Sequence, residues 1–372
     1  MFLALREMRH AKARYLLIMV IMLLVSFLVL FVTGLAKGLA YANISAVENM
    51  PANYFVVQED ADHTFRRSQM TVQDLQTAKS VAGDANAASL AVQTSTVTAA
   101  ENKLKVDITY FAVDMEGMLA PRITEGESVT NNQRGNVIVD RKLAESGIVV
   151  GSKLYDQATG LAWTVAGYTE DSSYSHTPVV YMNNTDWQAM RTGGGQGNTS
   201  AESVPYNVIA LHGSSEQAHT ITDTLDQVEV ITQKEAISSI PGYSAEQSSL
   251  MMMIVFLFVI SAFVLAVFFY VITIQKTSQF GILKAMGTRM SYLAWSVVGQ
   301  VLLLSVVSLS ISLLLTFAMN AALPDSMPFQ LEPSTLILTG CLFIGTSLAG
   351  SIISVGRVAR IDALEAIGRA YA

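Results

Sequence analysis

The chain has 372 residues, of which 51% are hydrophobic and only 14% are charged. Soluble proteins usually carry roughly a quarter charged residues, so this composition indicates a membrane protein. The net charge of −7 argues against nucleic acid as a partner, because phosphate binding needs clustered lysine and arginine.

The apolar residues form one block near the N-terminus and three near the C-terminus. The first block, Tyr15 to Leu35, is long enough to cross about 30 Å of hydrocarbon as a helix. It is also longer than the apolar core of a cleaved signal peptide, which is the alternative interpretation. The pattern predicts a membrane protein with four transmembrane α-helices and a large α+β extracytoplasmic domain between helices 1 and 2.

Lysine and arginine cluster before the first apolar block, between the second and third, and after the fourth. The positive-inside rule therefore predicts a multi-pass plasma-membrane protein with both termini in the cytoplasm. The predicted segments are a cytoplasmic N-terminal segment (1–14), transmembrane helix 1 (15–40) with an outward stalk to about residue 50, the extracytoplasmic domain (51–244), a stalk and transmembrane helix 2 (245–275), a cytoplasmic coupling loop (276–291), transmembrane helices 3 (292–319) and 4 (334–356), and a cytoplasmic C-terminal segment (357–372).

The outer segment alternates apolar and polar residues in short runs that are rich in Val, Ile, Tyr and Thr, which predicts strands. Two amphipathic stretches with Ser or Thr near their starts predict helices, and a glycine-rich stretch predicts a loop. One group of strands comes before this loop and one after it, which is consistent with two lobes. The predicted strands are 53–58, 105–114, 135–140, 161–169, 177–182 and 206–212, the helices are 71–81 and 214–225, and the loop is 191–200.

The sequence contains no motif of a hydrolase, a metal site or an ATPase. There is no G-x-S-x-G, no H-E-x-x-H and no P-loop, so any ATP must be bound by another chain, and no catalytic or metal-ligating residue is expected. The single cysteine, Cys341, lies in an apolar run and is expected to be a small packing residue.

The loop between the second and third apolar blocks reads "IQKTSQFGILKAMGTRMSYL" (274–293). It predicts a short amphipathic helix that ends at Gly287, because glycine commonly terminates helices. Such a helix suits docking onto a cytoplasmic partner, and an interfacial anchor that only touches lipid headgroups is the alternative. The residues expected to couple to an ATPase are Phe280, Gly281, Ile282, Leu283, Ala285, Met286 and Gly287.

This loop resembles the coupling loop of the FtsX/MacB superfamily of ABC transporter permeases, whose pattern is close to R-x-x-E-x-G-I-L-x-A-x-G-A. The closing stretch "ARIDALEAIGRA" (359–370) resembles the family's terminal pattern, with Ala363 where the family commonly has proline. The resemblance implies a homodimer that works with two copies of an ATP-binding subunit. It also implies mechanotransmission, in which ATP-driven motion travels along the first two helices to the outer domain.

The N-terminal stretch "MFLALREMRHAKARYLLI" and the stretch "YSHTPVVYM" (174–182) resemble the haem-exporting HrtB permeases of Gram-positive bacteria. The resemblance implies efflux of haem that would otherwise be toxic. Export of or resistance to antimicrobial peptides or lipids, and regulation of an extracellular hydrolase in the manner of FtsX, remain alternatives. No charged residue lies in the middle of a span, which disfavours an ion-coupled transporter.

A haem site would need an apolar slot, axial ligands such as Tyr, His or Met, and a cation for the propionates. Tyr41 and Glu48 are seven residues apart and so share one helix face, with Ile44 near it. Alternatively, Tyr41 is an interfacial anchor, Glu48 is solvated, and the methionines of helix 2 are packing residues. The candidate haem-binding residues are Tyr41, Ile44, Glu48, Met251, Met252 and Met253, with Tyr174, His176 and Tyr181 as a further set.

Overall fold

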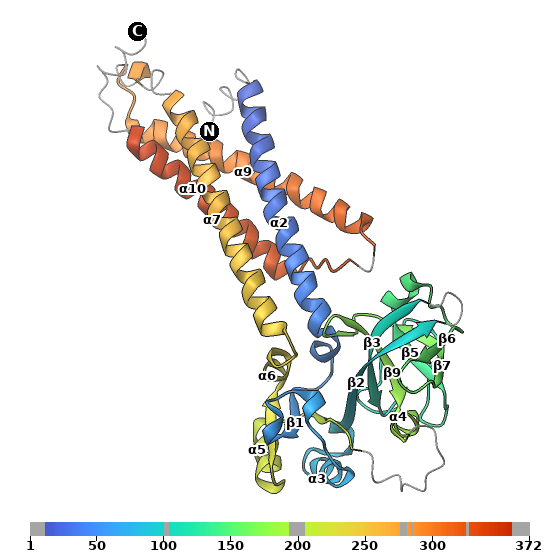
Figure 1. Cartoon of the computed structure of the whole chain (residues 1–372). Coiled ribbons are helices and arrows are strands. Elements are labelled where there is room, and N and C mark those ends of the chain that lie inside the picture. The colour runs from blue at the N-terminus through green and yellow to red at the C-terminus, as the bar shows by residue number, and fades with distance from the viewer. Residues whose placement is uncertain are drawn as a thin grey trace. The chain divides into compact units, whose positions relative to one another are not determined.

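The computed structural model describes residues 12–99, 104–192, 205–275, 281–283, 286–324 and 327–358. The chain divides into two compact units (Figure 1). The first, Met1–Gly38 with Ser248–Ala372, is called the membrane unit below, and the second, Leu39–Gln247, is called the outer domain.

The described part of the membrane unit contains the four helices that are long and apolar enough to cross a bilayer. They are α2 (Lys12–Glu48), α7 (Tyr243–Gln275), α9 (Met290–Ala322) and α10 (Pro333–Val358). These helices confirm the four predicted spans. Helix α2 has 37 residues and exceeds the roughly 20 needed to span a bilayer, as the predicted stalk requires.

Hydroxyl groups join α2 to α9 inside the membrane unit. The side chains of Ser308 and Ser312, one turn apart on α9, donate to the backbone carbonyls of Met19 (3.2 Å) and Leu23 (2.9 Å) on α2. Ser312 also hydrogen-bonds to Ser26 of α2. In a membrane the hydrophobic effect does not drive helices together, because the lipid tails are as apolar as the side chains. Small hydroxylated residues let two helices approach closely and form hydrogen bonds between them. This seam fixes α2 against α9.

The loop between α9 and α10 docks on two glycines of α2. A Cβ atom at Gly34 would lie 2.7 Å from the Phe329 ring, and one at Gly38 would overlap the backbone of Pro328. The amide of Gln330 donates to the Gly34 carbonyl at 3.1 Å. Only glycine at both positions allows this approach, so the stretch Gly34 to Gly38 is a docking surface for the loop. We call this contact the glycine latch.

Cys341 departs from its prediction as a core residue. Its side chain is exposed on α10. The apolar run around it is a membrane span, where an exposed position is still surrounded by apolar material, so an apolar neighbourhood in the sequence does not imply burial inside the protein.

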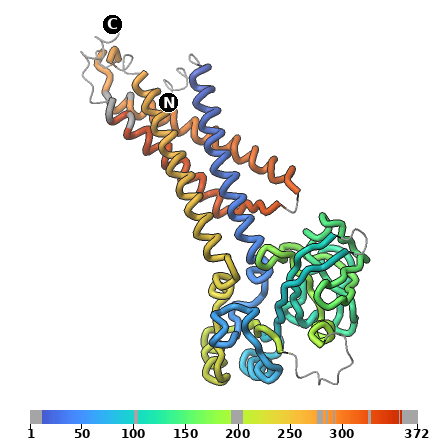
Figure 2. The backbone as a smooth tube through the Cα atoms, viewed as in Figure 1, coloured from blue at the N-terminus to red at the C-terminus, as the bar shows by residue number. Residues whose placement is uncertain are grey.

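The outer domain is an 11-stranded mixed sheet with helices on its outer faces. Figure 2 traces its backbone. The strands are β1 (Tyr54–Gln58), β2 (Ala87–Ala99), β3 (Lys105–Val113), β4 (Glu125–Gly126), β5 (Asn136–Asp140), β6 (Lys153–Asp156), β7 (Ala162–Thr169), β8 (Ser173–Tyr174), β9 (Thr177–Asn183), β10 (Val208–Leu211) and β11 (Val228–Thr232), and the helices are α3 (Val72–Ala82), α4 (Asn184–Arg191), α5 (Ser215–Thr224) and α6 (Gln233–Ser238).

Two lobes share the long strand β2. Its first residues pair with β10, which continues through β1 to β11. Its later residues pair with β3 and β6, and the pairings β3–β9, β9–β5, β5–β7 and β7–β6 close a ring of six strands. The core inside this ring contains Tyr110 and Trp163, and the Trp163 indole donates to the Tyr110 hydroxyl at 3.1 Å. The predicted two-lobed α+β domain is therefore confirmed.

The predicted strands and the two predicted helices all occur within about two residues of their expected bounds. Side chains that accept from the first turn begin several helices: Thr71, Ser214 and Thr232 each form a capping box. Strands β2, β4, β6, β8 and β11 and helices α4 and α6 were not predicted. The predicted loop 191–200 lies mostly outside the described residues.

We expect Gly38→Leu to destabilise the membrane unit. The new side chain would push the Pro328 backbone away and break the bond from Gln330 to Gly34, and overpacking of this kind costs about 1–3 kcal/mol. The midpoint of thermal unfolding of the detergent-purified chain should fall by several degrees. Gly299→Leu is the matched control, because a Cβ there meets nothing within 4 Å. Equal midpoints for the two variants would contradict the latch.

Candidate functional site

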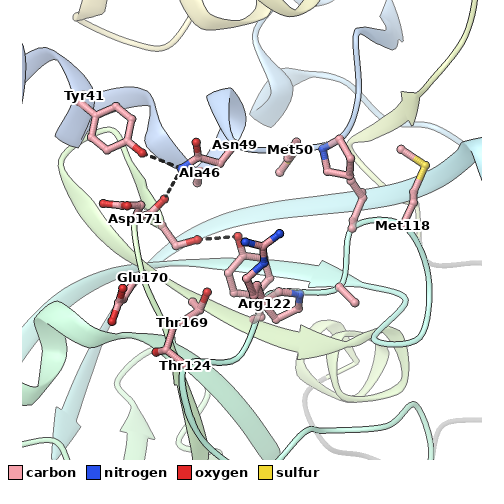
Figure 3. Close-up of a pocket in the computed structure, with 16 residues that line it drawn as sticks. Tyr41, Ala46, Asn49, Met50, Met118, Arg122, Thr124, Thr169, Glu170 and Asp171 are labelled. Atoms are coloured by element: carbon pink, nitrogen blue, oxygen red, sulfur yellow. Dashed lines mark hydrogen bonds between the residues drawn. The ribbon is translucent and has the colours of Figure 1, made fainter. Parts of the chain in front are cut away.

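The outer domain contains a pocket of about 640 Å³ beside the end of α2, and we call it the α2 pocket (Figure 3). Its volume lies within the roughly 300–1,000 Å³ of small-molecule sites. It is lined by Tyr41, Ala46, Asn49, Met50, Pro51, Met118, Leu119, Ala120, Pro121, Arg122, Thr124, Thr169, Glu170, Asp171, Ser172 and Tyr181.

One wall of the pocket is built by the last turns of α2 and the turn after β7. The side-chain amide of Asn49 donates both to the Tyr41 hydroxyl (2.8 Å) and to the backbone carbonyl of Asp171 (3.0 Å). Figure 3 shows these three residues connected along one side of the pocket. Asn49 uses one acceptor site of the phenol, so the Tyr41 hydroxyl keeps its proton and a second lone pair for a ligand.

The loop after β3 supplies residues of opposite character. Met118 and Leu119 give apolar surface, and Arg122 gives a positive charge, which forms no salt bridge with any residue that the structure describes. Glu170 and Asp171 place carboxylates at the same pocket. The pocket therefore combines a phenol, a guanidinium, thioethers and two acids, which suits an amphipathic ligand that carries charge.

Tyr181 closes the pocket from the domain interior. Its hydroxyl lies 2.8 Å from Ser172 Oγ, and the Ser172 amide donates to the buried carboxylate of Asp140 at 2.7 Å. Burial raises the pKa of Tyr181 to about 12 and also raises the pKa of Asp140. These groups are buried and mutually bonded, so they support the wall and are not open to a ligand.

Only part of the helix face predicted as a haem site lines this pocket. Tyr41 does, whereas Glu48 is exposed at the last position of α2 and is not among the lining residues. Ile44 was expected near this face, but it is only 7% exposed and belongs to the buried core of the outer domain with Val47 and Phe65. The strands cover that side of α2, and the spacing of residues along a helix cannot reveal which side is covered.

The three methionines near the start of α7 have exposed side chains. Met251, Met252 and Met253 are 56%, 58% and 44% exposed. Their exposure leaves them accessible to lipid, to a second protein chain or to a ligand. Their role in haem binding stays a prediction.

The further candidates Tyr174, His176 and Tyr181 have separate environments. Tyr174 is 1% exposed and packs against Phe65 and Phe111 in the core, and burial raises its pKa. His176 lies in the turn between β8 and β9, where Ser175 and His176 both have positive φ (50° and 62°). The three residues do not form one site.

His176 instead joins a cluster with Asn43 of α2 and Glu246 of α7. Glu246 Oε2 lies 2.8 Å from the Asn43 amide nitrogen and 2.9 Å from His176 Nε2. Asn43 is 1% exposed and Glu246 is largely shielded. We call this the Asn43–His176–Glu246 cluster. It connects the outer ends of two helices and a strand turn within the outer domain, and no local sequence pattern could reveal it because the partners are far apart in the chain.

The predicted coupling segment is described in part, since Phe280 and Ala285 lie outside the described residues. Gly281, Ile282 and Leu283 are helical. The Thr288 amide donates to the Leu283 carbonyl at 3.0 Å, and Gly287 has φ +89°. This bond and left-handed glycine end the helix in the manner of a Schellman motif, which confirms the predicted stop at Gly287.

Two apolar side chains of this segment are exposed. Ile282 and Met286 are 54% and 69% exposed, and the Met286 amide donates to the Ile282 carbonyl at 3.1 Å. Leu283 is partly buried against the core of the membrane unit. The segment therefore presents Ile282 and Met286 outward while Leu283 anchors it.

Four helices long and apolar enough to span a bilayer, with a large α+β domain between the first two and an exposed apolar turn between the next two, are the architecture of a multi-pass membrane protein. Residues 251–363 match the family described as FtsX-like permease C-terminal, so this part of the chain is an FtsX-like permease domain.

The similar proteins extend over the whole chain. The "Putative hemin transport system permease protein HrtB" of Staphylococcus haemolyticus is 29% identical over 368 residues, which cover 99% of each chain. The protein of the same name in Staphylococcus epidermidis is also 29% identical over 99% of each chain. An uncharacterized ABC transporter permease of Mycobacterium bovis is 25% identical over 380 residues, again 99% of each chain.

Two solved structures of outer domains are similar to part of the chain. The extracellular domain of the noncanonic ABC-type transporter YknZ from Gram-positive bacteria is 17% identical, covers 48% of this chain and 98% of its own, and gives a TM-score of 0.35. The periplasmic region of MacB from Actinobacillus actinomycetemcomitans is 9% identical, covers 51% and 94%, and gives a TM-score of 0.37.

We expect Glu246→Ala to destabilise the outer domain by about 1–3 kcal/mol, because the buried Asn43 amide would lose its carboxylate acceptor. The measurement is the unfolding midpoint of the full chain. The matched control is Glu229→Ala, which removes an equally short His–Glu pair, His63–Glu229, whose carboxylate is more exposed than that of Glu246, and it should cost less than about 1 kcal/mol. A larger loss for the control would contradict the structural role of the cluster.

Proposed function

We propose that this chain is the permease subunit of an ABC-type efflux pump that exports haem from the membrane and thereby relieves haem toxicity. The observation that carries the proposal is the 29% identity, over 99% of each chain, to proteins named as hemin transport permeases. This sequence similarity extends over both the transmembrane spans and the outer domain. It therefore includes the parts of the chain that would contact a substrate, and not only the helices that hold the protein in the membrane.

The α2 pocket has the chemistry that haem would need. Haem is a flat amphipathic macrocycle with two carboxylates. Tyr41 would offer a phenol to ferric iron, and Arg122 would offer a guanidinium to a propionate. Met50, Met118 and Leu119 would lie against the apolar ring. We also propose haem contacts by Glu48 at the end of α2 and by Met251, Met252 and Met253 on α7. Ile44 is buried in the core, so it would support the position of Tyr41 and would not contact haem itself.

The pump would work by mechanotransmission. A separate ATP-binding subunit, in two copies, would bind ATP and move the coupling segment around Ile282 and Met286. Helices α2 and α7 would carry that motion outward, because both contribute residues to the membrane unit and to the outer domain. The Asn43–His176–Glu246 cluster would then transmit movement of either helix to the strand turn that holds His176.

The permease would act as a homodimer with α7 at the interface. Only 11% of the most apolar 18-residue stretch of α7 is buried, against 33% in each of the other three spanning helices. The least covered helix of a single copy is the one with most surface to offer a second copy. Its exposed residues include Phe256, Ile260, Phe263 and Val267.

A second candidate substrate is a cationic antimicrobial peptide. Glu170 and Asp171 at the α2 pocket favour it, because carboxylates would attract lysine and arginine side chains. Haem is preferred because the pocket also offers Tyr41 and Arg122, and a peptide cation would be repelled by the latter.

The proposed function is tested by the visible spectrum of the purified chain on titration with haemin. We expect a shifted Soret band that Tyr41→Phe removes, and an affinity lowered about tenfold, or about 1.4 kcal/mol, in Arg122→Gln. Tyr155→Phe is the control, because Tyr155 is exposed at 42% and does not line the pocket. If the Soret band of haemin does not shift with the unmodified chain, haem is rejected as the substrate. If the shift persists in Tyr41→Phe, the α2 pocket is rejected as the haem site.

We expect Met286→Asp to uncouple the permease from its ATPase. A charge on this exposed apolar surface would oppose docking of the partner without disturbing the core. The measurement is haem efflux together with ATPase activity in membranes that contain both subunits, and both should fall at least about tenfold. Met327→Asp, on an exposed loop residue between α9 and α10, should leave both unchanged. Normal efflux by Met286→Asp would reject the coupling role.

A further inference from the structure

The membrane unit contains a second hollow, an apolar groove of about 540 Å³ between the beginning of α9 and the end of α10. On α9 its residues are spaced i, i+3, i+4, i+7, and on α10 i, i+4, i+7, i+8, so one face of each helix lines it. The residues are Ser291, Ala294, Trp295, Val298, Leu348, Ile352, Val355 and Gly356. No role described above uses this groove.

Small residues keep the groove open. A Cβ atom at Gly356 would meet nothing within 4 Å, and Ala294 faces the same space. Val355 is 8% exposed in the core of the membrane unit and forms part of the groove lining, whereas Trp295 and Ile352 are 75% and 59% exposed. The groove therefore has a buried floor at Val355, and the exposed side chains of Trp295 and Ile352 form its rim.

The groove lies near the ends of two spanning helices, toward the membrane boundary. Its residues on α9, which begins at Met290, belong to the first turns, and its residues on α10, which is described to Val358, belong to the last turns. Trp295 and the exposed Tyr292 are the amphipathic aromatic residues that concentrate at this boundary. A hollow in this position opens to acyl chains at one end and to headgroups at the other.

Positive charge lies at the headgroup end. Arg289 is exposed and immediately precedes α9, whose first turn has no side-chain cap. The start of a helix carries a partial positive charge, which adds to that of the guanidinium. An apolar channel that ends beside this charge complements a molecule with a fatty chain and an anionic head.

We propose that this groove binds an anionic phospholipid, with an acyl chain between α9 and α10 and the phosphate near Arg289. The site is distinct from the route proposed for haem and does not depend on it. The predicted orientation of the chain puts this end of α9 on the cytoplasmic side, where membranes carry anionic lipids.

The three tryptophans make the groove observable by fluorescence. Trp163 and Trp187 are 4% and 3% exposed in the core of the outer domain, whereas Trp295 is 75% exposed in the groove. Bromine atoms on lipid acyl chains quench tryptophan on contact, so they report on Trp295. The full chain is reconstituted in phosphatidylcholine vesicles in which either brominated phosphatidylglycerol or brominated phosphatidylcholine replaces part of the lipid. Trp295→Phe gives the unquenchable background.

At equal mole fraction, we expect brominated phosphatidylglycerol to occupy the site about fivefold more strongly than brominated phosphatidylcholine. Arg289→Gln should abolish that preference. Gly356→Leu should also abolish it by filling the groove. Gly345→Leu, on the same helix and likewise without neighbours within 4 Å of its Cβ, should retain it.

Equal quenching by the two lipids in the unmodified chain would show ordinary contact with bulk lipid and overturn the proposal. A preference that persists in Gly356→Leu would show that the anionic lipid binds outside the groove, and would overturn it as well. A preference lost equally in Gly345→Leu would mean that disturbance of α10 as a whole is responsible, which also contradicts the proposed site.

Discussion

The unbroken backbone hydrogen bonding of α2 is the constraint on which the other features depend. In hydrocarbon every amide and carbonyl must find a partner within the protein, and a helix meets this requirement along its whole length. Because α2 continues from Lys12 to Glu48, its residues contribute to the serine seam, to the glycine latch, to the Asn43–His176–Glu246 cluster and to the α2 pocket. A break in this helix would separate the features that it now connects.

The α2 pocket brings together groups of opposite charge that would form an ion pair if they were not held apart. Glu170 and Asp171 are fixed by the turn after β7, Arg122 by the loop after β3, and Tyr41 by the helix. The acids and the guanidinium belong to separate backbone segments, and no ion pair among the described residues joins them. The pocket therefore offers both signs of charge to a ligand, together with apolar surface from the methionines.

The spans and most strands could be predicted because their signals are local. A span needs only enough consecutive apolar residues, and a strand with one buried face shows alternation. Strand β2 (AASLAVQTSTVTA) was missed because its side chains are mostly small or hydroxylated, although its first six residues are all buried. Small residues give a weak hydrophobic signal, and burial on both faces removes the alternation.

The candidate site was less predictable because it is assembled from distant segments. Tyr41 followed from its place on an outward-projecting helix. Asn49, Arg122 and Asp171 could not be found, because nothing in the sequence shows that the loop after β3 and the turn after β7 approach α2. The burial of Ile44 could not be found for the same reason, since the side of α2 that the strands cover is decided by tertiary packing.

The glycine latch has a mechanical consequence. Gly38 divides α2 into arms of unequal length, about 40 Å from Lys12 to the latch and about 15 Å from the latch to Glu48. If α2 tilts as a rigid rod about this fulcrum, a displacement of its inner end by about 5 Å becomes one of about 2 Å at its outer end, in the opposite direction. The helix would then act as a lever. The displacement at the residues beside Tyr41 would be smaller than at the inner end, and the force there would be larger.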